Sequence, residues 1–239
     1  MDQSAAEKIA EHVRVLREGD DAAKTAAARG LTDVSHRSQH YYGSIIADAG
    51  GIPLLVELLR DGSAGAKESA AQALGVIAWT NAGQVLIAEA GGIPPLVDLL
   101  RDGSAETKLI TAWALAFLSR DNDDNKVLIA DAGGIAPLVD LLRDGSASAK
   151  GQAATTLRNL AGSSAGGNDA NAVAIAVAVG FDAVVEFARR GRLTVDNHPV
   201  VFASVPAKRK AALVVAALLG DRVPDSVPRV IKAVIGSYL

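Results

Sequence analysis

The sequence predicts an all-α fold, a solenoid of about five stacked helical repeats with a helical cap at each end. Two recurring motifs carry this prediction. A double glycine returns at steps of 41 and 42 residues, beginning at Gly50, Gly91 and Gly133. The motif LLRDGS returns at the same steps, beginning at Leu58, Leu99 and Leu141. A fixed period of about 40 residues indicates units that bury their apolar faces against one another.

The first half of the clearest unit predicts two helices. A short helix over residues 84–90 ends at Gly91, because a residue without a side chain readily takes the left-handed conformation that ends a helix. A second helix has Pro94 and Pro95 in its first turn, where a missing amide proton costs little. The glycine of LLRDGS then ends this second helix.

The second half of the unit predicts a longer third helix, over about residues 105–119. Ser104 precedes it as an N-cap residue. Ala112, Leu115 and Leu118 follow at three-residue spacing, which forms one buried stripe on a helix. Aromatic residues make up only 4% of the chain, so the core must be built mainly from aliphatic side chains.

The same landmarks divide the whole chain. Residues 1–45 match the second and third helices of a unit, with Leu16 aligned to Leu59, and are expected to form a cap. The later insertion LTVDNHPVVFASVP contains two prolines. The expected parts are a degenerate N-terminal capping repeat (1–45), three repeats (46–86, 87–128 and 129–174), a divergent repeat with an insertion (175–220) and a C-terminal capping helix (221–239).

These units resemble the armadillo repeat family. The run AGGIPPLV, the motif LLRDG and a long helix ending in ALAFLS or TLRNLA are similar to the family's consensus in three successive units. Weaker copies extend the resemblance over about residues 11–220. The resemblance implies a right-handed superhelix whose third helices line a long concave face. HEAT repeats, which lack the separate short helix and the double glycine, fit less well.

In peptide-binding members of that family, the motif Trp-Ala-Leu-x-Asn lies on the third helix, and its Trp and Asn hold an extended basic peptide. The resemblance places the Trp position on Arg29, Gln72, Trp113, Thr155 and Leu213. It places the Asn position on Asp33, Val76, Phe117, Asn159 and Ala217. No repeat has both residues, which argues against activity as a nuclear-import receptor.

We expect the partner-binding groove to be centred on Trp113 and Phe117, which lie one helical turn apart on one face. Aromatic residues at such positions are common binding anchors. An alternative remains open, in which Phe117 fills a gap against the next unit and only Trp113 is exposed. The expected groove residues are Arg29, Asp33, Gln72, Val76, Trp113, Phe117, Thr155 and Asn159.

Charge is unevenly distributed along the chain. From residue 189 onwards there are nine Lys or Arg and three Asp or Glu, whereas residues 1–188 have fifteen and twenty-four. This makes residues 189–239 a candidate surface for an acidic partner or a nucleic acid, with a basic patch formed by Arg189, Arg190, Arg192, Lys208, Arg209 and Lys210. A nucleic-acid platform requires aromatic residues that alternate with the cations, and none do so here. A solvated cap face is therefore the preferred interpretation.

The sequence predicts neither an enzyme nor a cofactor or metal protein. No nucleophile and base occur in a recognisable arrangement. His36 and His40 have the spacing of a helical metal site, but no Cys, Asp or Glu lies near enough to complete it. The Arg-Asp pairs that begin at Arg60, Arg101 and Arg143 lie where each second helix ends, and we interpret them as structural.

We therefore expect a protein-interaction scaffold or adaptor that binds an extended peptide or a helix of another protein. The alternative is a structural subunit held in a larger assembly through its ends or its convex face. Neither a small-molecule substrate nor membrane insertion is expected, and the free chain is expected to be monomeric. The chain has no cysteine and no secretory signal, which favours an intracellular, cytoplasmic location, with the nucleus or an organelle left open.

Overall fold

A computed structural model describes residues 3–36, 42–162, 171, 174–175, 178, 192–195 and 198–202. It divides into two compact units, Met1–Gly134 and Ile135–Leu239, and each is described by itself. The helices of the first unit and of residues 135–161 confirm the all-α class, and three-helix repeats recur through the first unit.

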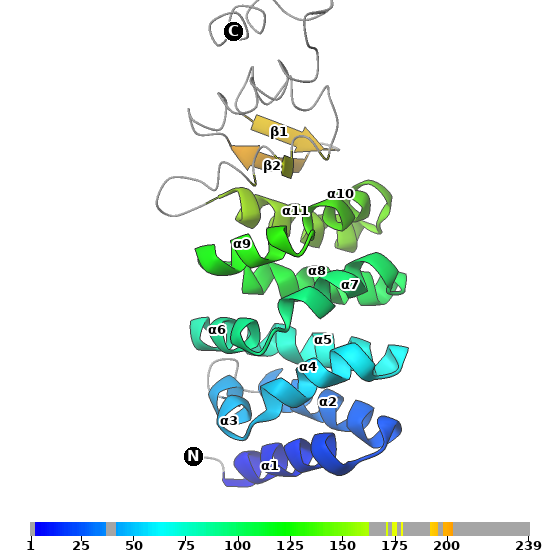
Figure 1. The fold of residues 1–239 in the computed structure, drawn as a ribbon, viewed down its shortest axis with the longest axis vertical. Helices are drawn as coiled ribbons and strands as arrows, with labels where there is room; N and C mark the ends of the chain where they lie inside the picture. The colour runs from blue at the N-terminus through cyan, green and yellow to red at the C-terminus, as the bar shows by residue number, and fades with distance from the viewer. Residues whose placement is uncertain are drawn as a thin grey trace, which may run out of the picture. The chain divides into compact units, whose positions relative to one another are not determined.

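The first unit consists of nine helices in the part of it that the structure describes. They are α1 (Gln3–Glu18), α2 (Asp21–His36), α3 (Tyr42–Asp48), α4 (Gly51–Asp61), α5 (Ala64–Ile77), α6 (Asn81–Glu89), α7 (Ile93–Asp102), α8 (Ala105–Leu118) and α9 (Asp123–Asp131). Short helices α3, α6 and α9 pack in succession along one side of this unit, as Figure 1 shows. The long helices α2, α5 and α8 pack in succession as a second layer, and α4 packs against α7.

Repeated positions in the sequence become repeated positions in the core. Ile46, Ile87 and Ile129 of the three short helices have no exposed surface. Leu55 and Leu96, one from each second helix, are also fully buried. The same residue type therefore fills the same place in successive repeats, as the periodicity predicted.

The helix ends also follow local sequence signals. Ser63 and Ser104 cap α5 and α8, each accepting a hydrogen bond from the amide three residues further on. The short helix α6 begins at Asn81, three residues earlier than predicted, because the side chain of Thr80 caps it by accepting from the Gly83 amide. The predicted ends of the second and third helices agree with α7 and α8 within one residue.

Each double glycine ends a short helix by the predicted conformation. Gly50, Gly91 and Gly133 have φ of 75°, 70° and 78°. The arginines of the LLRDGS motif reach the turns at Gly91 and Gly133 from the preceding repeat. The Arg60 guanidinium donates to the Gly91 carbonyl (3.2 Å), and that of Arg101 donates to the carbonyls of Ala132 (2.8 Å) and Gly133 (3.4 Å). The arginines are thus structural, since they link successive repeats by satisfying helix-terminal carbonyls.

The His12 side chain of α1 packs against Gly30 of α2. A Cβ atom at Gly30 of α2 would overlap its imidazole ring. Burial lowers the pKa of His12 below its ordinary value of 6.5, while the charges of Glu11 and Asp33 act in the opposite direction. The neutral imidazole is therefore the form that packs between α1 and α2.

The second unit contains α10 (Ile135–Asp144), α11 (Ala147–Ala161), β1 (Arg192–Val195) and β2 (His198–Phe202) among the residues that are described. The strands pair antiparallel, with Arg192 opposite Phe202 and Val195 opposite His198. The sequence predicted an insertion here but no strands. The predicted helix AKRKAALVVAALLG and the C-terminal capping helix lie outside the described residues.

Candidate functional site

The six expected groove residues of the first unit lie on three helices that pack in succession. Arg29 and Asp33 are on α2, Gln72 and Val76 on α5, and Trp113 and Phe117 on α8. We call this surface the third-helix face. Its residues differ in accessibility, since Arg29 and Asp33 are exposed, Gln72, Trp113 and Phe117 are half-buried, and Val76 is only 4% exposed. Val76 therefore supports the face from beneath.

Trp113 packs against the neighbouring helix α5 at a position that has no side chain. Gly75 lies in the last turns of α5, and a Cβ atom there would overlap the six-membered part of the Trp113 indole. The missing side chain thus allows the indole to lie against the α5 backbone. A glycine in a helix interior lowers helix stability by about 1 kcal/mol relative to alanine. At Gly75 this loss accompanies the room that the glycine leaves for the indole of Trp113.

Phe117 joins two tryptophans into one cluster. Its ring stacks on that of Trp79, with centroids 4.8 Å apart and planes 22° apart. It meets the ring of Trp113 edge-on, with centroids 5.1 Å apart and planes 78° apart. Both are favourable aromatic geometries, each contributing about 1 kcal/mol beyond simple burial. The ring of Phe117 thus packs against Trp79 of the preceding repeat, whereas the open alternative expected it to fill a gap against the next repeat.

Arg120 places a positive charge on this cluster. Its guanidinium carbon lies 5.0 Å from the Phe117 centroid and 5.9 Å from the Trp79 centroid. The same guanidinium donates a 2.9 Å hydrogen bond to the Trp79 carbonyl, which lies just beyond the end of α5. The cation–π contacts and this bond fix the side chain between two successive repeats. We call Trp79, Trp113, Phe117 and Arg120 the aromatic cluster.

A buried polar network holds the backbone under the aromatic cluster. The side-chain amide of Gln84, which is 1% exposed, donates to the Phe117 carbonyl at 2.9 Å. Asn125, which is 2% exposed, donates to the Leu118 carbonyl at 2.9 Å. These bonds satisfy two carbonyls at the end of α8, which would otherwise be orphaned in the interior. They also fix α8 relative to the short helices α6 and α9.

Three parts of the site, Gly75, Trp79 and Arg120, were not predicted from the sequence. A signal existed for two of them, because Trp79 and Arg120 are 41 residues apart and so occupy equivalent positions in successive repeats. One repeat has an aromatic residue at this position and the next has a cation, so the repeats differ there in chemistry. Only the structure shows that the two side chains meet.

The remaining candidate residues lie in the second unit. Thr155 and Asn159 are both half-buried on α11, and the Thr155 hydroxyl donates to the Gly151 carbonyl at 2.9 Å. Arg192 is the first residue of β1. The other members of the expected basic patch, and His40 of the histidine pair, lie outside the described residues.

Within the described part of the chain, no group of three or more His, Asp or Glu side chains is arranged to hold a metal ion. None of the described helices is long and apolar enough to cross a membrane.

Comparisons with known proteins support the repeat architecture. The family profile described as Armadillo/beta-catenin-like repeat matches residues 44–79, 80–120 and 122–162. No curated protein matches the sequence. Among solved structures, an engineered protein is similar with a TM-score of 0.67 and 28% identity, covering 96% of this chain and 86% of that chain.

Two further solved structures are designed armadillo repeat proteins. One, in complex with the peptide (KR)4, has a TM-score of 0.65 and 22% identity, covering 97% of this chain and 99% of that chain. Another, computationally designed for modular peptide recognition, has a TM-score of 0.67 and 23% identity, covering 96% of this chain and 99% of that chain. At these identities the likeness concerns the fold alone.

Proposed function

This chain belongs to the armadillo repeat family, and we propose that it is a non-enzymatic scaffold that holds a segment of another protein on its third-helix face. The fold is typical of protein-binding repeat proteins. The proposal rests chiefly on one observation, that two half-buried aromatic rings, Trp113 and Phe117, lie in contact on this face. Rigid aromatic residues of this kind often dominate binding energy, because they bury a large area with little loss of side-chain freedom.

The surroundings of the aromatic cluster support an apolar contact. Leu109 and Ile110 precede Trp113 on α8 and are also half-buried. A partner side chain placed beside Trp113 would therefore bury aliphatic as well as aromatic surface. Gln72 on α5 is half-buried and supplies an amide that can hydrogen-bond the backbone of a bound segment.

Arg120 supports a particular partner chemistry. Its guanidinium already lies over Phe117 and Trp79, where a basic ligand would otherwise place a cation. A second cation there would be repelled, whereas a carboxylate would be attracted. We therefore propose that the bound segment presents an apolar side chain to Trp113 and an acidic residue to Arg120. This differs from the basic peptide (KR)4 bound by one of the designed armadillo proteins.

We also propose that α1 and α2 form the N-terminal cap of the stack. Ile9, Val13 and Leu16 of α1 are buried, whereas the opposite side of the helix exposes ion pairs of Arg14 with Glu11 (2.6 Å) and Glu18 (3.5 Å). A terminal unit needs such a polar outer face because nothing stacks on it.

A binding screen tests the proposed site. The purified chain would be screened against a display library of 15-residue peptides, and Kd values of the recovered peptides would be measured for wild type and for Trp113→Ala with Phe117→Ala. Loss of two buried anchors should cost about 2 kcal/mol or more, or about thirtyfold in Kd. Recovered peptides should combine apolar and acidic residues, and Arg120→Gln should weaken the acidic ones selectively.

The matched control is Val85→Ser with Val127→Ser, which removes exposed apolar side chains from other helices of the same unit. This variant should bind the recovered peptides as wild type does. Circular dichroism must show that both double variants keep the helical fold. Binding of the Trp113 and Phe117 variant within about twofold of wild type would show that the site is placed wrongly.

A further inference from the structure

A second surface of the first unit is apolar, and it lies on the short helices rather than on the third-helix face. Among the described residues, the exposed large hydrophobic side chains are Val85, Leu86, Val127 and Leu128. They are 38–46% exposed. Val85 and Leu86 are on α6, and the other two occupy the equivalent positions on α9, 42 residues later. We call these four residues the short-helix patch.

The two halves of the short-helix patch lie on neighbouring helices, because α6 and α9 pack against each other. Single exposed aliphatic residues are common on protein surfaces, but their concentration at equivalent positions of two touching helices is not. The residue that follows the patch residues on each helix belongs to the core, since Ile87 and Ile129 have no exposed surface, whereas the patch residues themselves stay exposed. Core packing therefore does not account for the patch.

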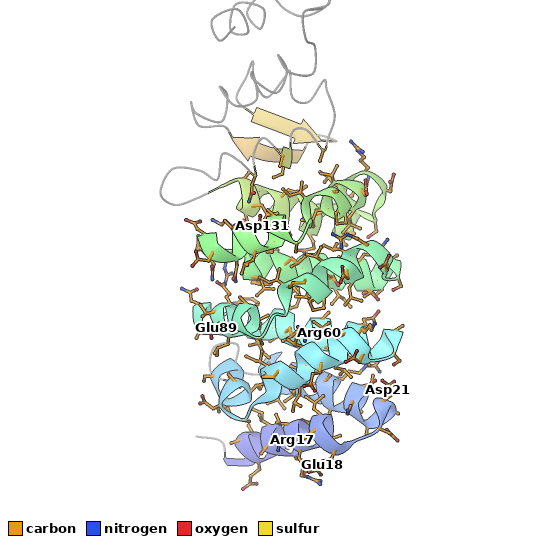
Figure 2. The ribbon with its side chains drawn as sticks, in the orientation of Figure 1. Arg17, Glu18, Asp21, Arg60, Glu89 and Asp131 are labelled. Carbon is orange, nitrogen blue, oxygen red and sulfur yellow. The ribbon has the colours of Figure 1, made fainter. Side chains whose placement is uncertain are left out.

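Acidic residues border the patch. Glu89 and Asp131 lie at the last positions of α6 and α9, are exposed, and are seen on the same side of the unit in Figure 2. A negative charge at a helix C-terminus opposes the helix dipole, so these acids do not stabilise their own helices. The exposed Asp124 borders the patch near the start of α9, and Asp48 ends the preceding short helix α3.

Few cations offset these acids. Lys126 of α9 has a side chain only 5% exposed and pairs with Asp123 at 2.7 Å. The guanidinium groups of Arg60 and Arg101 lie at the turns that follow α6 and α9. Arg60 donates to the Gly91 carbonyl, and Arg101 donates to the next turn and pairs with Asp98 at 2.7 Å. The described short helices α3, α6 and α9 themselves carry five acidic residues and one basic residue, so acids outnumber bases beside the patch.

We infer that the short-helix patch is a docking site for an amphipathic helix of a partner protein, one that carries Lys or Arg beside its apolar stripe. A helix satisfies its own backbone hydrogen bonds, whereas an extended segment would meet only aliphatic side chains on this patch and would leave its backbone groups unpaired. Packed helices lie about 8–10 Å apart, and seven residues of a helix rise about 10.5 Å. Apolar residues seven apart on the docked helix thus reach α6 and α9 together.

The test uses two stapled helical peptides of 18 residues with the same leucine stripe, one flanked by lysines and the other by glutamates. Fluorescence anisotropy at low salt should show the lysine peptide binding wild type about tenfold more tightly, since several exposed ion pairs add up to that much. Leu86→Gln with Leu128→Gln should weaken it at least tenfold. Glu89→Lys with Asp131→Lys should reverse the preference toward the glutamate peptide.

The control is Trp113→Ala with Phe117→Ala, which should bind the lysine peptide as wild type does. This control separates a wrong assignment of the short-helix patch from a wrong assignment of the third-helix site, on which the proposed function rests. Circular dichroism checks the fold of every variant. Three results would overturn the inference. These are binding of neither peptide, equal binding of both, or sedimentation of wild type as a dimer that the Leu86 and Leu128 variant abolishes, which would make a second copy the occupant.

Discussion

The three left-handed glycines provide a quantitative test of how successive repeats are linked. Gly50, Gly91 and Gly133 have nearly the same φ, so alanine at any of them meets the same backbone strain, about 1 kcal/mol. Their surroundings differ. A Cβ atom at Gly50 has no other atom within 4 Å, whereas one at Gly133 would lie 2.8 Å from the Arg101 guanidinium. Gly50→Ala therefore measures strain alone, and Gly133→Ala measures strain plus displacement of the arginine.

The magnitude follows from the bonds that Arg101 would lose. Its guanidinium donates to the Ala132 and Gly133 carbonyls at an exposed position, which is worth about 1 kcal/mol in total. We therefore expect Gly50→Ala to lower the free energy of unfolding by about 1 kcal/mol and Gly133→Ala by about 2 kcal/mol. Gly91→Ala should fall between them, since its Cβ would lie 3.1 Å from the Arg60 guanidinium.

Urea unfolding followed by circular dichroism measures these differences, with equal m-values as the condition for comparing them. The decisive control is a double-mutant cycle, because in an Arg101→Ala background Gly133→Ala should cost only as much as Gly50→Ala. If Gly133→Ala and Gly50→Ala cost the same in the wild-type background, the arginine link carries no stability and the reasoning is refuted.

Three further predictions concern the packing of the first unit. Because burial lowers the pKa of His12, the unfolded chain binds its proton more readily, so the free energy of unfolding should fall as the pH drops below about 6.5. His12→Gln should remove most of that loss between pH 7 and 5, and an unchanged pH profile in urea titrations would contradict it. Gly75→Ala gains about 1 kcal/mol of helix propensity but displaces the Trp113 indole, so stability should change little while acrylamide quenching of tryptophan fluorescence rises. Ser104→Ala removes the N-cap of α8 and should cost about 1 kcal/mol in thermal unfolding, and no loss would show that the cap is dispensable.

Most of the fold could be predicted because its signals are local and repeated. Glycine in a left-handed turn, proline in a first helical turn and serine at an N-cap each act on their own few residues, and the chain repeats them at a fixed step. The start of α6, which was misplaced by three residues, also had a local signal in Thr80, whose side chain caps the helix. The strand pair at 192–202 was missed because two short runs give too little alternation to distinguish strand from loop.

The candidate site could be predicted only in part, because it depends on contacts between repeats. Helical spacing alone places Trp113 and Phe117 on one face of α8. No local pattern shows that Trp79 stacks on Phe117, that Arg120 covers both, or that Trp113 needs Gly75 opposite it. The accessibility of Val85 and Leu86 likewise depends on which side of a nine-residue helix the next repeat covers.

The most direct test of a binding site on the third-helix face uses the chain's two tryptophans, Trp79 and Trp113, which both belong to the aromatic cluster. Two indole N–H signals are therefore expected in an NMR spectrum of the labelled protein. Titration with a peptide that combines apolar and acidic residues, the kind expected on this face, should shift both signals with one Kd, equal to that from calorimetry. Saturable binding by calorimetry that leaves both indole signals unmoved would contradict the account.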